Sequence, residues 1–433
     1  MEQQIDKKMR KTILTLAIAA ACTGLSAQDH LSLTLEQAQQ YAVENNKSLQ
    51  NASLEVRQAH AQRWQTIAAM LPQADLSLGL NHATGYLKFM ETKHDQNYTS
   101  GSLSANASVA INGQMIVGAL LNNIAIEMQN ISLAQSEKNL RANVTTTYMT
   151  VLVMEDIVSL LDSSLTNIEQ LAEMTQRSVE VGVAEQTSAD QIMVKVNALK
   201  NSINSNKRNV ELARNSLKVL LGLNAETELT LSQTLDELLS AESALALLNE
   251  GFDINNNHDY QLLQKNVELA KKNVTMAGLA YAPTLSAFYQ YTAPNKYFSG
   301  ETTMEQQMGV VGLSLSVPVW SSGKRAAAVT EKKLAYQAAV NTFEETSDNL
   351  GIQDQQLRFN LSNAYETYMN ERDNIEVTKR VFNSTANKFE HGVASSLDLT
   401  NASNDLISAQ STYVQAILTL VNAQVELTKF LNK

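Results

Sequence analysis

The residues that most often perform catalysis or hold metals are few and scattered in this chain of 433 residues. Its histidines show no spacing typical of metal ligands, and we find no glycine-rich phosphate loop or nucleophile motif. The histidines are His30, His60, His82, His94, His258 and His391. The sequence therefore predicts a protein that is not an enzyme and that uses no cofactor and no metal ion.

Two glycine-centred motifs do recur at a fixed distance. Glu180-Val-Gly182-Val183-Ala is followed 210 positions later by Glu390-His-Gly392-Val393-Ala. Glycine in such a motif is typical of a turn with positive φ. The two motifs predict two similar turns in different parts of the chain.

Other motifs repeat at nearly the same offset. Asn46-Lys-Ser-Leu recurs 211 positions later as Asn257-His-Asp-Tyr, and Pro72 recurs at the same offset as Pro283. A constant offset over more than 100 residues indicates a duplicated unit.

A carboxylate follows the second glycine turn. Asp398 lies six residues after Gly392. With Ser396 as the N-cap of the next helix, Asp398 falls in the first helical turn, where a carboxylate is favoured by ~0.3–1 kcal/mol at the positive end of the helix dipole. Asp190 is expected to have this role in the first copy. A functional role for Asp398 stays open beside this structural one.

The N-terminus has the pattern of a secretory signal peptide, residues 1–27. A basic segment precedes an apolar run from Thr12 to Cys22, and small residues end at Ala27. Cys22 is the one cysteine. Two interpretations stay open for it: an ordinary residue of the leader, or a lipidated N-terminal cysteine, although Ala19 stands where a lipobox normally has leucine.

Charge and hydropathy restrict the function further. Removing a leader with four positive and two negative residues takes the net charge from −11 to −13, which argues against nucleic acid as a partner. Beyond the leader we find no apolar run near the ~20 residues of a membrane-spanning helix. Contact with membrane lipid must therefore come from strands.

Four segments near the repeated prolines alternate strictly between apolar and small or polar residues. Such runs have the ~9–11 residues of a tilted membrane strand, although a half-buried soluble hairpin shows the same period. They predict hairpins at about 73–111 and 284–317. The apolar positions are Leu76, Leu78, Leu80; Leu103, Ala105, Ala107, Val109, Ile111; Leu285, Ala287, Tyr289, Tyr291; and Val311, Leu313, Leu315, Val317.

The remaining sequence is free of proline and follows heptads, which predicts coiled-coil helices. We expect helices over Leu35–Met70, Val117–Val181, His258–Tyr281 and Lys324–His391, and a shorter return helix of about 35 residues after each glycine turn. At ~1.5 Å per residue each long helix reaches roughly 100 Å. The heptad positions are Ile192, Val196, Leu199, Ile203, Val210, Leu217 and Leu220 in the first copy, and Leu406, Tyr413, Leu420 and Leu427, with Ala402, Ala409, Ala416, Ala423 and Phe430, in the second.

These patterns predict a mainly α protein with a transmembrane β-barrel. The first repeat covers 28–224, a short mixed segment 225–255, and the second repeat 256–433. Four strands cannot close a barrel, and open strands in lipid leave backbone groups unsatisfied. Two copies would give eight strands and a barrel filled by side chains, whereas three give twelve and a lumen. We expect a homotrimer.

The mature chain resembles the TolC family of outer-membrane efflux proteins. The segment Leu33-Thr-Leu-Glu-Gln-Ala38, the helix-to-strand junctions at Pro72 and Pro283, and the strand-to-helix passage around Pro318 are similar to the family's pattern. Asn112 departs from it, since the family often has proline there. The two glycine turns resemble the family's periplasmic tips.

The resemblance implies a channel in the outer membrane whose helical part lies in the periplasm. Gly182, Val183, Gly392 and Val393 would dock a periplasmic adaptor linked to an inner-membrane transporter. Asp398 matches a family aspartate that closes the tip, whereas Asn401 stands where a second aspartate is common. Ser188 replaces Asp398 in the first copy. A trimer would then present one ring of three carboxylates.

Two other functions are weighed against an export channel. One is a coiled-coil envelope scaffold without a pore, which the four alternating strands disfavour. The other is a passive porin, in which such long helices have no purpose. Residue types leave the exported substrate open.

Overall fold

The computed structural model describes residues 30–83, 86–89, 92–95, 98–182, 184–238, 241–293 and 308–432. The predicted leader with Cys22, and the turn residue Val183, lie outside these ranges. The chain divides into two compact units. The first contains the chain up to Ser48, Glu137–Gly251 and Asp354–Lys433, and the second contains Leu49–Ser136 and Phe252–Gln353. Each unit thus includes segments from both predicted repeats.

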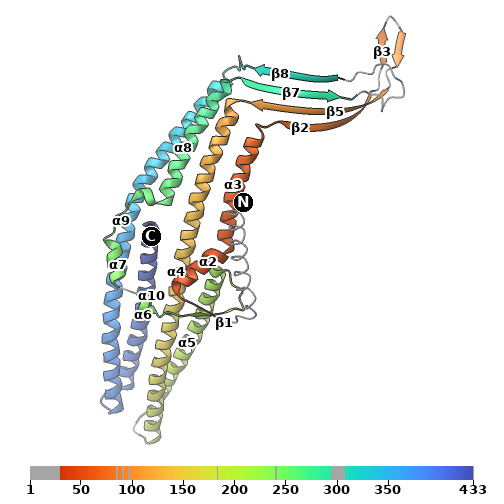
Figure 1. Ribbon diagram of the computed structural model, residues 1–433. Coiled ribbons are helices and arrows are strands. Elements are labelled where there is room, and N and C mark those ends of the chain that lie inside the picture. Colours follow the sequence, from red (N-terminus) through yellow and green to blue (C-terminus); the bar gives the residue numbers. More distant parts are fainter. Residues whose placement is uncertain are drawn as a thin grey trace, which may run out of the picture. The chain divides into compact units, whose positions relative to one another are not determined.

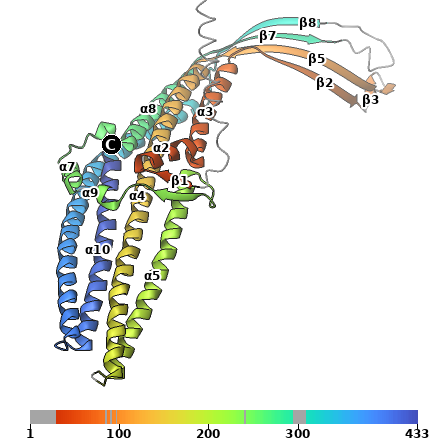
Figure 2. The same ribbon diagram turned by 60° about the horizontal axis from the view of Figure 1, so that its bottom comes forward.

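Long helices occur in two matching sets. Helix α4 (Gly113–Glu180) has 68 residues and α9 (Lys324–Glu390) has 67, and each is followed by a return helix, α5 (Gln186–Leu221) or α10 (Ser396–Phe430). In Figures 1 and 2, α4 lies beside α5 and α9 lies beside α10. This doubled arrangement confirms the predicted mainly α fold class.

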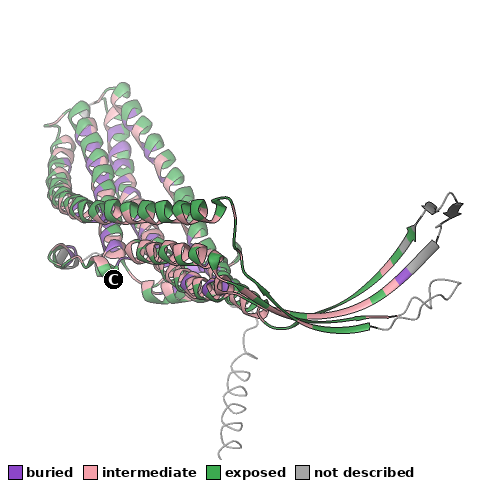
Figure 3. Cartoon of the chain, turned by 90° about the horizontal axis from the view of Figure 1, so that it is seen from above, coloured by how far each residue is buried: buried purple, intermediate pink, exposed green. Residues whose placement is uncertain are grey.

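The predicted heptad positions form the helical core. In α5 every predicted position is buried except Leu220, which is half-buried. Most of those in α10 are buried too, with Tyr413 and Ala423 half-buried. Figure 3 shows buried residues along the helices and mostly exposed or half-buried residues along the strands.

The N-terminal helix predicted over Leu35–Met70 is wrong as one continuous helix. It is split into α2 (Leu35–Asn45) and α3 (Lys47–Ala68), because Asn46 has an extended backbone with φ −65° and ψ 125°. The Asn46 amide donates to the carbonyl of Leu220 at 2.9 Å, and its Oδ1 accepts from the Ser48 amide at 2.9 Å. Asn46 therefore stops one helix and caps the next.

The repeated asparagine has the same capping role in the second copy. Asn257 precedes α8 (His258–Gly278), and its side chain accepts from the backbone amides of Asp259 and Tyr260. A short 3₁₀ turn, η3 (Leu279–Tyr281), then leads to the strands. The asparagine repeat detected in the sequence thus marks the N-caps of α3 and α8.

The mixed segment contributes one strand to a small parallel sheet that periodicity did not predict. Strand β1 (His30–Leu33) pairs with β6 (Glu228–Leu231), and α6 (Leu235–Leu238), α7 (Ala241–Leu248) and the 3₁₀ turn η2 (Ile254–Asn256) follow. The buried Tyr148 hydroxyl on α4 donates to the Leu33 carbonyl at 2.9 Å. That contact joins β1 to the long helix.

The expectation of no apolar segment of membrane-spanning length is also wrong. Helix α4 contains an 18-residue window that is long and apolar enough to cross a membrane by length and composition. Its consecutive residues Val151, Leu152 and Val153 are buried, as are Val144 and Tyr148. Because a packed core helix passes the same test, this window is weak evidence of a span.

Four antiparallel strands form one sheet in the order β2-β5-β7-β8. They are β2 (Gln73–Ala83), β5 (Tyr98–Ile111), β7 (Thr284–Thr292) and β8 (Met308–Ser316). The connection between β2 and β5 carries a further hairpin, β3 (Tyr86–Phe89) and β4 (Thr92–Asp95). The predicted hairpins are therefore joined into a single sheet.

The register places the predicted apolar positions of all four strands on one face. Leu76 lies opposite Ala105, Ala105 opposite Tyr291, and Leu285 opposite Leu315. The leucines of this face are exposed in the single chain, for example Leu78 at 70% and Leu313 at 81%, whereas Ala105 is half-buried. The other face carries polar contacts, including the Asn106 amide donating to Asp75 at 3.1 Å.

We predict that Asn46→Ala destabilises the protein by roughly 1–3 kcal/mol. The substitution removes a helix cap and leaves the part-buried Leu220 carbonyl without this donor. Thermal unfolding followed by circular dichroism at fixed protein concentration measures the effect as a lower Tm. Asn201→Ala, at an exposed position of α5, is the control and leaves Tm unchanged; an equal Tm in both variants contradicts the prediction.

Candidate functional site

The glycines of the two turns have the same left-handed backbone conformation. Gly182 has φ 79° and Gly392 has φ 72°. The Gly182 amide donates to the Val179 carbonyl, and the Gly392 amide donates to that of Phe389. In the second turn the Val393 amide also donates to Lys388 at 2.8 Å, which completes a Schellman motif.

Backbone conformation, not crowding, explains why glycine occupies both turns. A Cβ added at Gly182 or Gly392 would meet no atom within 4 Å, but both residues are in the left-handed region that L side chains rarely adopt. The turns also expose apolar side chains: Val181 is 74%, Val393 76% and Leu397 61% exposed. Each turn is thus a fixed shape with apolar side chains open to contact.

Asp398 is the N3 residue of a capping box at the start of α10. The N-cap is Ser395, so the expected cap at Ser396 is wrong by one residue. Asp398 Oδ2 accepts from the Ser395 amide at 2.9 Å and from its hydroxyl at 2.7 Å, and the Asp398 amide donates to Ser395 Oγ at 3.1 Å. These bonds from Ser395 lower the pKa of the fully exposed Asp398 carboxyl.

The corresponding turn of the first copy is built differently. Glu185 is the N-cap of α5 and makes no side-chain cap bond, and Ser188 occupies the position of Asp398. The expected first-turn role of Asp190 is wrong, since the first turn of α5 holds no acidic residue. Asp190 instead accepts from the Gln186 side chain at 2.9 Å. The capping carboxylate is therefore a feature of the second turn.

The other predicted residues occupy separate places. Asn401 is an exposed residue of α10, one turn beyond Asp398. Pro72 lies between α3 and β2, and Pro283 lies between η3 and β7. Pro318 follows β8, and its carbonyl accepts from Arg325 Nη1 at 2.6 Å. The prolines thus stand where helix and strand meet, in a different unit from the glycine turns.

Asn112, the departure from the family pattern, has a local role. Its Oδ1 accepts from the Met115 backbone amide at 2.9 Å at the start of α4. A side-chain cap thus begins the long helix where proline would otherwise fix φ. Within the described ranges, no group of three or more His, Cys, Asp or Glu side chains could hold a metal ion.

One apolar cluster connects the two helical hairpins behind their turns. It joins Leu171 and Ile192 of the first hairpin to Phe382 and Leu399 of the second. Lys195 donates to Asn404 at 2.9 Å, and the buried Gln410 donates to Ser164 at 3.1 Å. Helix α10 therefore contacts both helices of the first hairpin.

Three ion pairs at heptad spacing connect α4 and α5. Lys200 pairs with Glu169 at 2.8 Å, Lys207 with Asp162 at 3.3 Å, and Arg214 with Glu155 at 2.8 Å. Successive partners are seven residues apart on both helices, as expected for antiparallel neighbours in a coiled coil. We call these three pairs the ion-pair ladder. Sequence reasoning missed it, although opposite charges equidistant from the midpoint between residues 184 and 185 were a usable signal.

Comparison with known proteins identifies the class. The model of the outer membrane efflux protein family matches residues 38–223 and 254–433. Toxin and drug export protein A of Aggregatibacter actinomycetemcomitans is 22% identical over 392 residues, 88% of this chain and 82% of that protein. Thus the chain belongs to the outer membrane efflux protein family, and its location is the outer membrane.

Other similarities are weaker in sequence or shorter in extent. TtgC of Pseudomonas putida, a probable efflux pump outer membrane protein, is 23% identical over 298 residues. The match covers 67% of this chain and 60% of TtgC, less than two thirds of that protein. The crystal structure of the outer membrane protein VceC of Vibrio cholerae has a TM-score of 0.71 at 16% identity, covering 92% of this chain and 95% of VceC. That likeness supports the fold.

We predict that Ser395→Ala destabilises the start of α10 by ~1 kcal/mol, the usual cost of losing a serine cap. Hydrogen exchange of the intact protein, followed in the peptide that contains residues 395–402, measures the loss as faster exchange of its backbone amides at pH 6. Ser188→Ala is the matched control, because Ser188 is the N3 residue of α5, where the N-cap makes no side-chain cap bond. Equal protection in wild type and Ser395→Ala would contradict the capping role.

The same cap has a pH dependence with a definite sign. Because the folded pKa of Asp398 lies below the ordinary 3.8, its carboxylate stabilises the fold fully above pH 3.8 and loses this contribution as the pH falls below it. The fall in Tm between pH 6 and pH 3 should be smaller in Asp398→Asn than in wild type. An identical fall in Tm in both proteins would contradict the stabilising role of the Asp398 carboxylate.

We predict that the ladder pairs contribute unequally. Arg214 directs both Nε and Nη2 to Glu155 Oε1, and these side chains are 38% and 32% exposed, less than in the other two pairs. Double-mutant cycles should give a larger coupling for Arg214–Glu155 than for Lys207–Asp162, each within ~0.2–1 kcal/mol. High salt should reduce both couplings.

Proposed function

We propose that this chain is one protomer of a trimeric outer-membrane export channel. The observation that carries the proposal is the four-stranded sheet, which has one exposed apolar face and two edge strands, β2 and β8. Lipid favours the apolar face, but the edges need hydrogen-bonding partners. Three copies supply twelve strands, enough for a closed barrel with a lumen.

The helical part extends the channel into the periplasm in this proposal. The glycine turns, with Gly182, Val183, Gly392 and Val393, are its tips and dock a periplasmic adaptor. The exposed Val181, Val393 and Leu397 support docking, because exposed apolar side chains at a rigid turn are typical of contact surfaces. The adaptor links the channel to an inner-membrane transporter of a tripartite efflux or type I secretion system, and the transporter selects the cargo.

Asp398 forms part of the periplasmic gate in the same proposal, with Asn401 one turn further along α10. The Ser395 bonds hold the carboxylate in a fixed position and favour its charged form. Three symmetry-related copies would place three negative charges around one axis. Such a ring favours cations over anions. The same carboxylate serves both the helix cap and the gate, and no catalytic activity is part of the proposal.

Single-channel conductance in planar bilayers tests the pore and the gate separately. Wild type should show small, cation-selective steps, and Asp398→Ala should enlarge them or reduce the selectivity. Asp190→Ala, which changes an exposed carboxylate on α5 of the first hairpin, is the matched control and should resemble wild type.

The outcomes separate the two claims. Steps that Asp398→Ala leaves unchanged retain the channel and remove Asp398 from the gate. Inserted, oligomeric protein without conductance would contradict the channel and favour a scaffold.

A further inference from the structure

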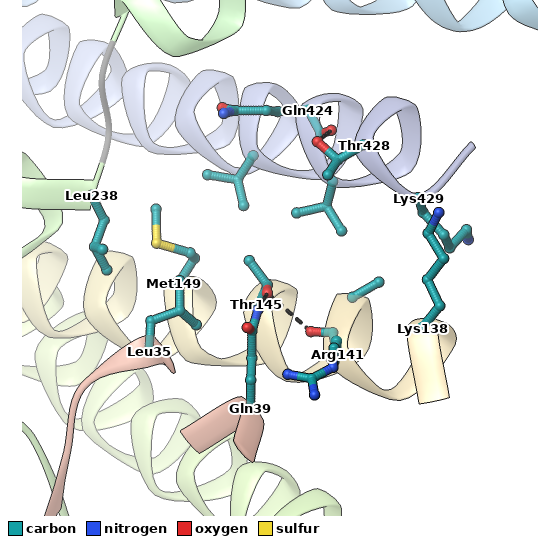
Figure 4. Close-up of a pocket in the computed structure, with 13 residues that line it drawn as sticks. Leu35, Gln39, Lys138, Arg141, Thr145, Met149, Leu238, Gln424, Thr428 and Lys429 are labelled. Carbon is teal, nitrogen blue, oxygen red and sulfur yellow. Dashed lines mark hydrogen bonds between the residues drawn. The ribbon is translucent and has the colours of Figure 1, made fainter. Parts of the chain in front are cut away.

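The first unit contains a pocket of about 410 Å³ that no part of the proposed channel function uses. Residues of α2, α4, α6 and α10 line it (Figure 4). Small-molecule sites in proteins usually have volumes of ~300–1,000 Å³. The pocket is therefore large enough for a small ligand or a short chain.

The two ends of the pocket differ in chemistry. Leu35, Met149 and Leu238 line one end, and Lys138 and Lys429 lie together at the other (Figure 4). Val421 and Val425 add to the apolar lining from α10. A ligand that fills the space must have an apolar part and a part that accepts positive charge.

The cationic end contains three basic side chains. Arg141 pairs with Glu137 at 2.8 Å, and Lys429 pairs with Glu426 at 2.7 Å. Lys138 instead donates to the amide oxygen of Asn432. Basic residues concentrated here stand out in a chain whose net charge is −11.

The surroundings of Lys138 disfavour the charged form of its amino group. Burial, and then the neighbouring charge of Lys429, lower the pKa of Lys138 to about 8. The other charged side chains that line the pocket are Arg141 on α4 and Lys429 on α10, which pair with Glu137 and Glu426. A bound anion beside both lysines would offset their repulsion and raise this pKa.

We propose that this pocket binds a single-chain anionic amphiphile, with its head group at Lys138 and Lys429 and its chain along Leu35, Met149 and Leu238. Charged hydrogen bonds to the lysines hold the head group. Burial of the chain supplies the hydrophobic part of the affinity. A fatty acid and an anionic detergent share this chemistry.

Equilibrium dialysis of radiolabelled dodecanoate tests the proposal on the full-length protein. Dodecyl maltoside is present at the same concentration on both sides of the dialysis membrane. It cancels the effect of dodecanoate partition into micelles and provides a neutral amphiphile as competitor. We expect saturable binding with one site per chain. Lys138→Met and Lys429→Met should each weaken it about tenfold or more, since each removes a charged contact. Lys333→Met on α9, which changes an exposed lysine outside the pocket, is the control and should bind as wild type.

Further arms separate head group from chain. Unlabelled dodecyl sulfate should compete with dodecanoate, and acetate at the same concentration should not. Competition by acetate would reduce the pocket to a simple anion site and overturn the amphiphile. Val425→Phe, which fills the apolar part without changing charge, should also weaken binding.

Two results would overturn the proposal. One is the absence of saturable binding, as expected if a neighbouring protomer fills the pocket. The other is equal affinity in wild type and both lysine variants. Neither result bears on conductance, so the channel proposal is tested independently.

Discussion

The edges of the four-stranded sheet impose the constraint on which the rest of this structure depends. Strands β2 and β8 each have a hydrogen-bonded neighbour on one side. The face formed by Leu78, Leu313 and their neighbours is apolar and exposed. Exposure of this apolar face to water is unfavourable, and lipid cannot form hydrogen bonds with the unpaired backbone groups of the edge strands. In the proposed channel, lipid covers the apolar face and further copies of the chain pair with the two edge strands.

The helices are subject to a similar requirement. Their heptads bury one side of each helix, yet large apolar residues remain exposed elsewhere, including Val219 on α5 and Phe359 on α9. Apolar surface of this kind is typical of contacts between chains. In the proposed trimer these exposed residues are available for contacts with neighbouring protomers.

Duplication has produced two hairpins with matching turn glycines and different side-chain chemistry. The first carries the ion-pair ladder between α4 and α5 and lacks a side-chain cap at Glu185. The second carries the Ser395–Asp398 capping box, and its Gln410 is buried against Ser164. A shared turn geometry thus supports distinct electrostatics at the two turns.

The sequence by itself determined what depends on local periodicity: the long helices, the alternating strands and the glycine turns, because apolar spacing and positive φ are properties of short segments. The order β2-β5-β7-β8, the β1–β6 pairing and the pocket at Lys138 were decided by tertiary structure. These features join residues up to about 300 positions apart, such as Lys138 and Asn432. Asn46 depends on both levels. Its repeat was visible in the sequence, but its hydrogen bond to the Leu220 carbonyl at the helix break became visible only in the tertiary structure.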